Sequence, residues 1–205
     1  MVDAMYELDL LNEHADRAYP ILSSLVTPRP IAWVTTLNED GSVNAAPFSF
    51  FNVFGSKPPL VIFAPGNREG GEPKDTARNC EREGEFVVNL VSEEMAAAMV
   101  GTAAGLAYGE SELAAGGLEP ADSVAVRTPR IAGVPAALEC GLHEIQRVGQ
   151  NRLVLGIVRR VLVEDSIFDA ETLRVRGELF HPVGRMASPD WYCRTRDLYE
   201  MRRPD

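Results

Sequence analysis

The chain has 205 residues, of which 45% are hydrophobic and 24% charged, and its formal net charge is −10. This length suffices for one domain with a substantial core, and no apolar run approaches the ~20 residues that a membrane span requires. The acidic N-terminal stretch lacks the basic region of a secretory signal, and the net negative charge argues against nucleic acid as the main partner. We therefore expect a cytoplasmic protein.

The cysteines and histidines are scattered along the sequence. No CxxC or HExxH spacing occurs, so the sequence predicts neither a zinc site nor a redox-active dithiol. Buried or idle thiols in a reducing compartment are the expected state. The residues concerned are Cys80, Cys140, Cys193, His14, His143 and His181.

The first predicted elements are a helical turn and a hairpin. Residues 19–26 favour one helical turn, which must end before Pro28 because proline disfavours helical backbone at the residue before it. Residues 31–37 and 43–51 favour two strands, and the Asp-Gly pair between them favours a tight turn. Pro47 cannot donate to a sheet ladder, so the second strand is expected at an edge or at a bulge.

This hairpin has two interpretations. Ala45 and Ala46 leave backbone amides approachable, and the rings of Phe48, Phe50 and Phe51 stand beside them. A flat heterocycle could therefore accept backbone hydrogen bonds here. The alternative is an ordinary edge hairpin that covers a hydrophobic core.

A strand, a glycine-rich loop and a helix follow. Residues 60–64 are compact and apolar, as in a buried strand, and residues 65–73 are polar and glycine-rich. Residues 74–83 favour a helix that Gly84 would end in the left-handed conformation.

The start of this helix is a candidate anion site. Free N–H groups and the helix dipole attract negative charge, and Arg68, Lys74 and Thr76 add cations and a hydroxyl. A nucleotide P-loop is excluded, because Glu72 follows the second glycine where lysine is required. The alternative is that Asp75 or Thr76 caps the helix and that Lys74 is solvated.

The second half of the chain is dominated by strands. We expect a strand at 85–91, a helix at 93–104, an irregular excursion at 105–135 and a long antiparallel pair at 136–148 and 152–164. Short strands and a polar tail complete the chain. Because strands outnumber helices and lie in hairpin order, the pattern predicts a mainly β fold, an antiparallel barrel with helices at its ends.

Signatures of a catalytic nucleophile are missing, so a cofactor would supply the chemistry of any enzyme activity. Arg29 lies between two prolines, where it could point into a pocket or form an ordinary surface ion pair. His143 is expected to be structural. Arg185 and Tyr192 alone are unremarkable.

Five segments in order resemble the flavin reductase-like proteins of the FMN-binding split-barrel superfamily, close to flavoredoxin-like members. They are PRPIAWVTT (28–36), NAAPFSFFN (44–52), PPLVIFAPG (58–66), KDTARN (74–79) and FVVNLV (86–91). The resemblance runs from about Tyr19 to Tyr192. It implies an extension over residues 1–18, one domain over 19–192 and a tail over 193–205.

The resemblance implies a six-stranded, antiparallel, Greek-key-like split barrel that dimerises and binds FMN near the interface. Thr35 and Thr36 would border the flavin. The isoalloxazine and the ribityl chain would be contacted by Asn44, Ala46, Pro47, Phe48 and Ser49. The phosphate would be held by Lys74 and Thr76, with Arg29 and Arg68, while Asp75 caps the helix and points away. His143, His181, Arg185 and Tyr192 would be weaker candidates, facing a nicotinamide or second substrate.

The implied reaction is hydride transfer from NADH or NADPH to the flavin, without a protein acid or base. The reduced FMN would leave for a partner monooxygenase or pass electrons to another redox protein. Two alternatives stay open: an FMN-bearing electron carrier without a nicotinamide site, and a non-catalytic split-barrel binding module. The sequence does not choose between NADH and NADPH.

Overall fold

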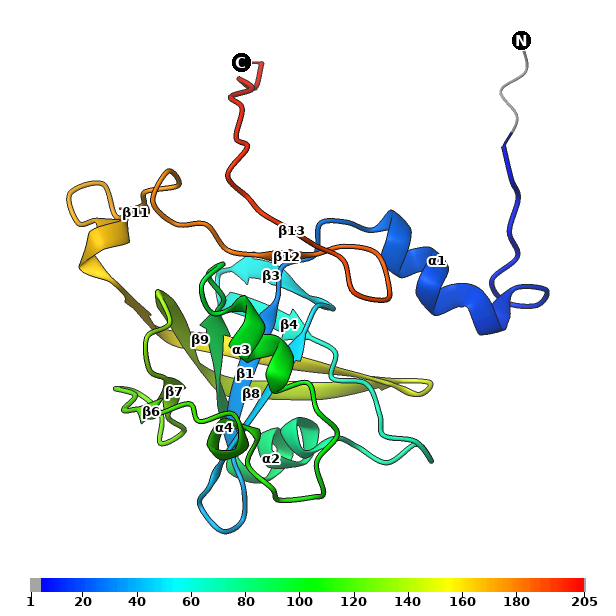
Figure 1. Ribbon diagram of the computed structural model, residues 1–205, viewed down its shortest axis with the longest axis horizontal. Helices are drawn as coiled ribbons and strands as arrows, with labels where there is room; N and C mark the ends of the chain where they lie inside the picture. Colours follow the sequence, from blue (N-terminus) through cyan, green and yellow to red (C-terminus); the bar gives the residue numbers. More distant parts are fainter. Residues whose placement is uncertain (1–4, 205) are drawn as a thin grey trace.

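The computed structural model describes residues 5–204, and its main element is an antiparallel sheet (Figure 1). Within these residues the sheet has seven strands, one more than the family resemblance implies, in the order β2-β1-β5-β8-β9-β4-β3. The mainly β architecture with peripheral helices is as predicted. The strands are β1 (Ala32–Leu37), β2 (Val43–Phe48), β3 (Phe51–Ser56), β4 (Pro59–Phe63), β5 (Glu85–Leu90), β8 (Ala136–Val148) and β9 (Asn151–Val163).

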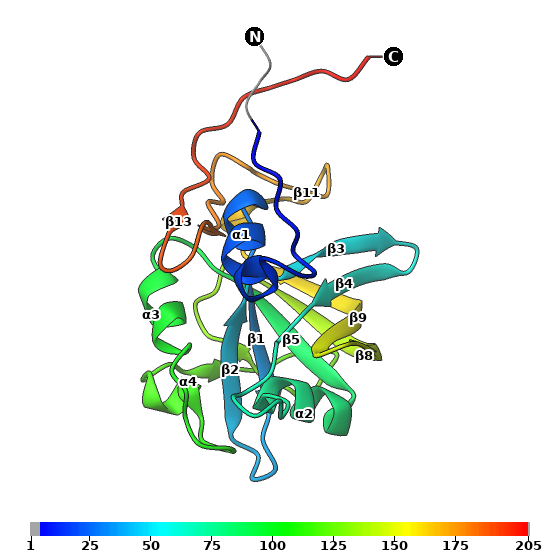
Figure 2. The same cartoon turned by 90° about the vertical axis from the view of Figure 1, so that its right-hand side faces the viewer.

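The helices are short and lie around the sheet (Figure 2). They are α1 (Ala18–Leu25), α2 (Asp75–Glu83), α3 (Ala96–Gly101) and α4 (Glu112–Ala115), with 3-10 turns at Ala15–Arg17 and Asp165–Ile167. Two-residue strands are β6 (Pro120–Ala121), β7 (Arg130–Ile131), β10 (Phe168–Asp169), β11 (Arg174–Val175), β12 (Gly184–Arg185) and β13 (Tyr192–Cys193). Within residues 5–204, every helix is too short or too polar to cross a membrane.

The predicted hairpin is confirmed, but its second strand ends earlier than expected. β1 and β2 pair from Ala32 with Phe48 to Leu37 with Val43, and β2 is an edge strand, as Pro47 requires. The expectation of one strand over 43–51 is wrong, because the chain bends at Ser49 and Phe50. Ala64 N donates to Phe50 O (2.8 Å), so the chain has already left β1 and joined β4 as strand β3.

Most other predicted elements are confirmed. α2 ends at Gly84, whose φ of 68° is left-handed, and β8 and β9 form the long pair. α3 covers only Ala96–Gly101 of the helix predicted over 93–104, and α1 is longer than one turn. The predicted N-terminal extension begins with four residues that lie outside the described chain.

Two hydrophobic clusters lie on the two faces of β1 and β5. One fills the barrel, where the rings of Phe63 and Phe86 meet edge to face at 5.3 Å. Gly156 on β9 makes room for Phe86, because a Cβ atom there would overlap its ring. The other cluster, around Trp33, is covered by α3, α4 and the excursion. The two faces thus separate the barrel interior from a second, loop-covered layer.

Candidate functional site

A cavity of about 630 Å³ lies beside the edge strand β2. Its other walls are the loop before α2, the chain that follows α3, and the start of α4. The structure brings seven of the eleven predicted site residues to this cavity. These are Asn44, Ala46, Pro47, Phe48, Arg68, Lys74 and Thr76.

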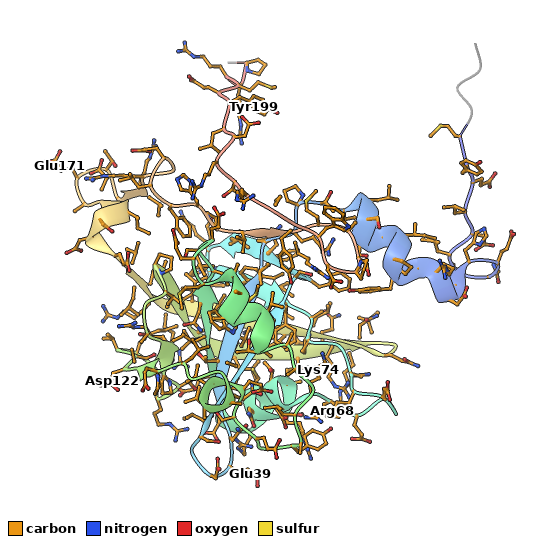
Figure 3. All side chains as sticks on the ribbon, viewed as in Figure 1. Glu39, Arg68, Lys74, Asp122, Glu171 and Tyr199 are labelled. Atoms are coloured by element: carbon orange, nitrogen blue, oxygen red, sulfur yellow. The ribbon has the colours of Figure 1, made fainter. Side chains whose placement is uncertain are left out.

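The cavity has a cationic end at the start of α2. Lys74 is the N-cap residue, and Figure 3 shows it beside Arg68. Lys74 as a residue is exposed, but neighbouring atoms shield its ammonium from part of the solvent, and this desolvation together with the charge of Arg68 lowers the pKa of Lys74. The ammonium lies 5.9 Å from the centre of the Phe48 ring, and no carboxylate within residues 5–204 forms an ion pair with it. This free cation beside a helix N-terminus is suited to an anion.

Asp75 does not cap the helix, contrary to expectation. Lys74 has the extended backbone of an N-cap residue (φ −66°, ψ 159°), so Asp75 is the first helical residue. Its carboxylate accepts a 2.7 Å hydrogen bond from Arg68 Nη2 and lines the cavity instead of pointing away. Arg68 Nη1 also donates to Leu106 O (3.0 Å). Arg68 therefore ties the loop before α2 to the chain after α3.

A buried network of amide and hydroxyl groups supports the cavity wall. Asn44 Nδ2 donates to Thr36 Oγ1 and to Thr76 Oγ1, both at 3.1 Å. Asn79 Nδ2 donates to the same Thr36 oxygen (3.1 Å). Thr36 is thus outside the cavity but holds Asn44, and Asn44 in turn fixes Thr76 at the start of α2.

The open edge of β2 is covered by α4. Ser111 Oγ donates to Val43 O (2.5 Å), and Ala45 N donates to Glu112 Oε2 (3.2 Å). The backbone amide that the sequence left approachable is therefore occupied by a side chain. Glu112 lines the cavity, and burial raises the pKa of its carboxyl. Sequence reasoning missed Glu112; its only local signal is Ser111, which caps α4 by accepting from Ala114 N (3.2 Å).

The other three predicted residues do not reach the cavity. Thr35 lies on the opposite face of β1 and donates to Pro129 O (2.7 Å). Arg29 is buried and donates to the carbonyls of Val26 (3.0 Å) and Met186 (2.9 Å), which is neither the surface ion pair nor the pocket cation of the two interpretations. Its Nε donates to Ser49 Oγ (3.3 Å), so Ser49 belongs to this structural cluster.

The weaker candidates also lie elsewhere. His143 is exposed on β8. The guanidinium carbon of Arg185 lies 4.6 Å from the centre of the Tyr192 ring, and the Arg185 backbone pairs with that of Arg29. His181 has a buried Nδ1 with no hydrogen-bond partner among the described residues. None of the four lines the cavity beside β2.

Comparison with known proteins gives concordant results. The model of the flavin reductase like domain matches residues 23–181. An uncharacterized protein of Deinococcus radiodurans is 43% identical over 190 residues, 90% of this chain and 84% of that protein. The crystal structure of 2-nitrobenzoate 2-nitroreductase from Pseudomonas fluorescens is 36% identical with a TM-score of 0.88, covering 97% and 96% of the two chains. Nitrilotriacetate monooxygenase component B from Bacillus cereus is 30% identical with a TM-score of 0.90, covering 97% and 100%.

Proposed function

This chain belongs to the flavin reductase-like domain family, and on that premise we propose that it is an FMN-binding oxidoreductase whose flavin occupies the cavity beside β2. One observation carries the proposal. The ammonium of Lys74 at the N-terminus of α2, which forms no ion pair with a described residue, and the apolar wall of Ala46, Pro47 and Phe48 line the same cavity. An anionic group and an aromatic ring system would thus be accommodated together.

The residues of the cavity fit such a ligand. A phosphate would take charge-assisted hydrogen bonds from Lys74 and Arg68 and from the free N–H groups of the first turn of α2. The ring would rest on the Phe48 side of the wall, and the polar linker would face Asn44 and Thr76. The volume of about 630 Å³ lies within the usual range of small-molecule sites.

FMN, when bound, would supply the hydride acceptor for NADH or NADPH. The chain's own task would be to bind and to orient. Lys74 would fix one end of the ligand, while the Thr36–Asn44–Thr76 network would keep the polar wall in place. Leu106, held by Arg68, would narrow access of water from the side of α3. No side chain would have to transfer a proton.

Two destinations of the electrons are proposed. The likeness to a monooxygenase component supports release of reduced flavin to a partner monooxygenase. The likeness to a nitroreductase, together with the Arg68 contact across the cavity, supports a second candidate in which FMN stays bound and reduces an aromatic acceptor.

We also propose a homodimer with the cavity near its interface. Phe50, Val53 and Phe54 are exposed at the β3 edge, and Tyr19 of α1 packs 6.0 Å from Phe50. Several exposed apolar side chains at one sheet edge are a feature that interaction surfaces often show. Gel filtration combined with light scattering would test this part of the proposal.

The primary test is the visible absorption spectrum of the purified protein after incubation with FMN. We expect a flavin band that bleaches when NADH or NADPH is added without oxygen. A band that persists with both nucleotides would contradict the reductase and favour the electron carrier. If the purified protein did not bind FMN, the proposed function would be refuted.

The Lys74→Met variant tests whether FMN binds in the cavity beside β2. Loss of a charge-assisted hydrogen bond should weaken FMN binding by roughly tenfold or more. The matched control is Lys57→Met, because Lys57 is the other lysine of the chain and is exposed at the β3–β4 turn. Equal affinities of the two variants would place FMN elsewhere.

A further inference from the structure

Glu112 is a buried carboxyl in the wall of the cavity, and the proposed mechanism does not use it. Glu112 is 9% exposed, and its side chain reaches the cavity from α4, which covers the edge of β2. Oε2 accepts the hydrogen bond of Ala45 N at 3.2 Å. Hydrogen bonds from backbone amides offset only part of the cost of burying a negative charge.

The charged groups that face the cavity do not neutralise this carboxyl. The loop before α2 contributes Arg68 and Glu69, and the start of α2 contributes Lys74 and Asp75. Arg68 is paired with Asp75 at 2.7 Å, whereas Glu112 forms no ion pair with any residue of the described chain. β2 and the chain after α3 add no charged side chain to the cavity. Burial, which is the largest effect, and the charge of Asp75 disfavour the ionised form of Glu112, whereas backbone amides and the charge of Arg68 favour it. A bound anion would disfavour the ionised form further.

We propose that the protonation of Glu112 controls how tightly the cavity holds FMN, and that FMN binding draws one proton from solvent onto this carboxylate. The inference rests on the proposed function. Two effects act in the same direction: FMN brings the negative charge of its phosphate, and it displaces water that would otherwise solvate the carboxylate. Both disfavour the ionised form of Glu112 in the complex.

The sign of the pH dependence follows from linkage. Burial already raises the pKa of Glu112 in the free protein, and the bound anion raises it further. Below the pKa that Glu112 has in the free protein, its carboxyl is neutral both with and without bound FMN, and FMN affinity is highest. Affinity falls as pH increases between the two pKa values and then levels off. Proton uptake is confined to the same interval.

Glu112→Gln is the decisive variant, because its amide oxygen can still accept the hydrogen bond of Ala45 N while the charge is lost. FMN affinity is measured by quenching of flavin fluorescence across the pH range. The two proteins should bind equally at low pH, and the variant should bind about tenfold more tightly at high pH. The phosphate of free FMN titrates at about pH 6, and this contribution is the same in the titrations of both proteins.

Glu69→Gln is the matched control. It removes the same charge from the exposed rim of the same cavity, where solvent screens it, so its pH profile should follow that of the unmodified protein. Parallel profiles for Glu112→Gln and the unmodified protein would overturn the inference and leave the proposed function intact. If neither the unmodified protein nor any variant bound FMN at any pH, the proposed function itself would fail.

Proton uptake gives a second readout that needs no variant. Calorimetric titration of the unmodified protein with FMN, in two buffers of different ionisation enthalpy, yields the number of protons exchanged. We expect net uptake that depends on pH and is lost in Glu112→Gln. If Glu112→Gln did not fold, absence of uptake by the unmodified protein would still refute the inference.

Discussion

Two segments of the chain between β5 and β8 are held to the protein in different ways. Residues 122–131, here called the anchored segment, are fixed by buried side chains of the sheet. Glu139 accepts from Val124 N (2.7 Å) and Ala125 N, and Asn89 Oδ1 accepts from Ile131 N (2.8 Å). Glu85 Oε1 accepts from the backbone N of Arg127 (2.7 Å) and Thr128 (3.0 Å).

Residues 104–110, here called the clamp segment, are held at the surface. The ring of Tyr108 packs against two guanidinium groups, whose central carbons lie 3.8 Å (Arg68) and 4.3 Å (Arg78) from the ring centre. Tyr108 OH donates to Pro73 O (2.8 Å), and Tyr108 is 43% exposed. The clamp segment thus contacts the loop before α2, and residues of both segments line the cavity beside β2.

The different anchoring of the two segments assigns them different roles: one supports folding stability, and the other controls ligand access to the cavity. Hydrogen bonds to buried carboxylates are strong and costly to leave unmade, whereas exposed cation–π contacts contribute roughly 0.5–1 kcal/mol each. The anchored segment should therefore open only when the fold does. The clamp segment can open at small cost, and Ala104, Gly105 and Leu106 within it line the cavity. We expect changes in the first to alter stability, and changes in the second to alter ligand exchange.

The largest effect is expected for Glu139→Ala. It leaves two backbone N–H groups without their charged acceptor, which should lower the free energy of unfolding by about 3 kcal/mol. Urea denaturation measures this change. The folded variant should bind FMN within a factor of about two of the unmodified protein, because Glu139 is remote from the cavity lining.

Glu144→Ala is the control on the same strand. Glu144 is exposed on β8, and its removal should change stability by no more than about 0.5 kcal/mol. If Glu139→Ala were equally mild, the hydrogen bonds that Glu139 accepts would contribute little to holding the anchored segment.

The next effect is expected for Tyr108→Ala. It removes both cation–π contacts and the hydrogen bond to Pro73 O, so the clamp segment should open more often. We expect the rate of FMN release, followed by stopped-flow fluorescence, to increase roughly tenfold, while the free energy of unfolding falls by about 1–2 kcal/mol, less than for Glu139→Ala.

Tyr199→Ala provides the control for that rate. Tyr199 is 82% exposed in the C-terminal tail, so its removal should leave release unchanged. A Tyr108→Ala variant that loses stability but releases FMN at the normal rate would assign the clamp segment to the fold and not to access.

Local signals made much of this fold predictable. The Asp-Gly turn, Pro47 and Gly84 each fix backbone geometry within a few residues, so the hairpin, its edge position and the end of α2 followed from the sequence. The cationic start of α2 was predictable for the same reason, because loop, glycines and cations are contiguous.

Contacts between distant segments were not predictable in this way. Glu112 reaches Ala45 across 67 positions, and Arg29 meets Met186 across 157, so no local pattern specifies either contact. Asp75 was misplaced by one position, because the N-cap is decided by the backbone of Lys74 and not by the better capping side chain. Thr35 and Thr36 are adjacent, yet the alternation of the strand sends only Thr36 toward Asn44.

Tyr108→Phe separates the contribution of the cation–π contacts from that of the hydrogen bond to Pro73 O. It should have the smallest effect on FMN release. The ring keeps its contacts with Arg68 and Arg78, and only the 2.8 Å hydrogen bond to Pro73 O is lost. An exposed hydrogen bond contributes roughly 0.5 kcal/mol, so FMN release should accelerate about two- to threefold. A variant as fast as Tyr108→Ala would show that the hydroxyl closes the clamp. The guanidinium groups would then only cover the ring, and the surface cations would have no part in access to the cavity.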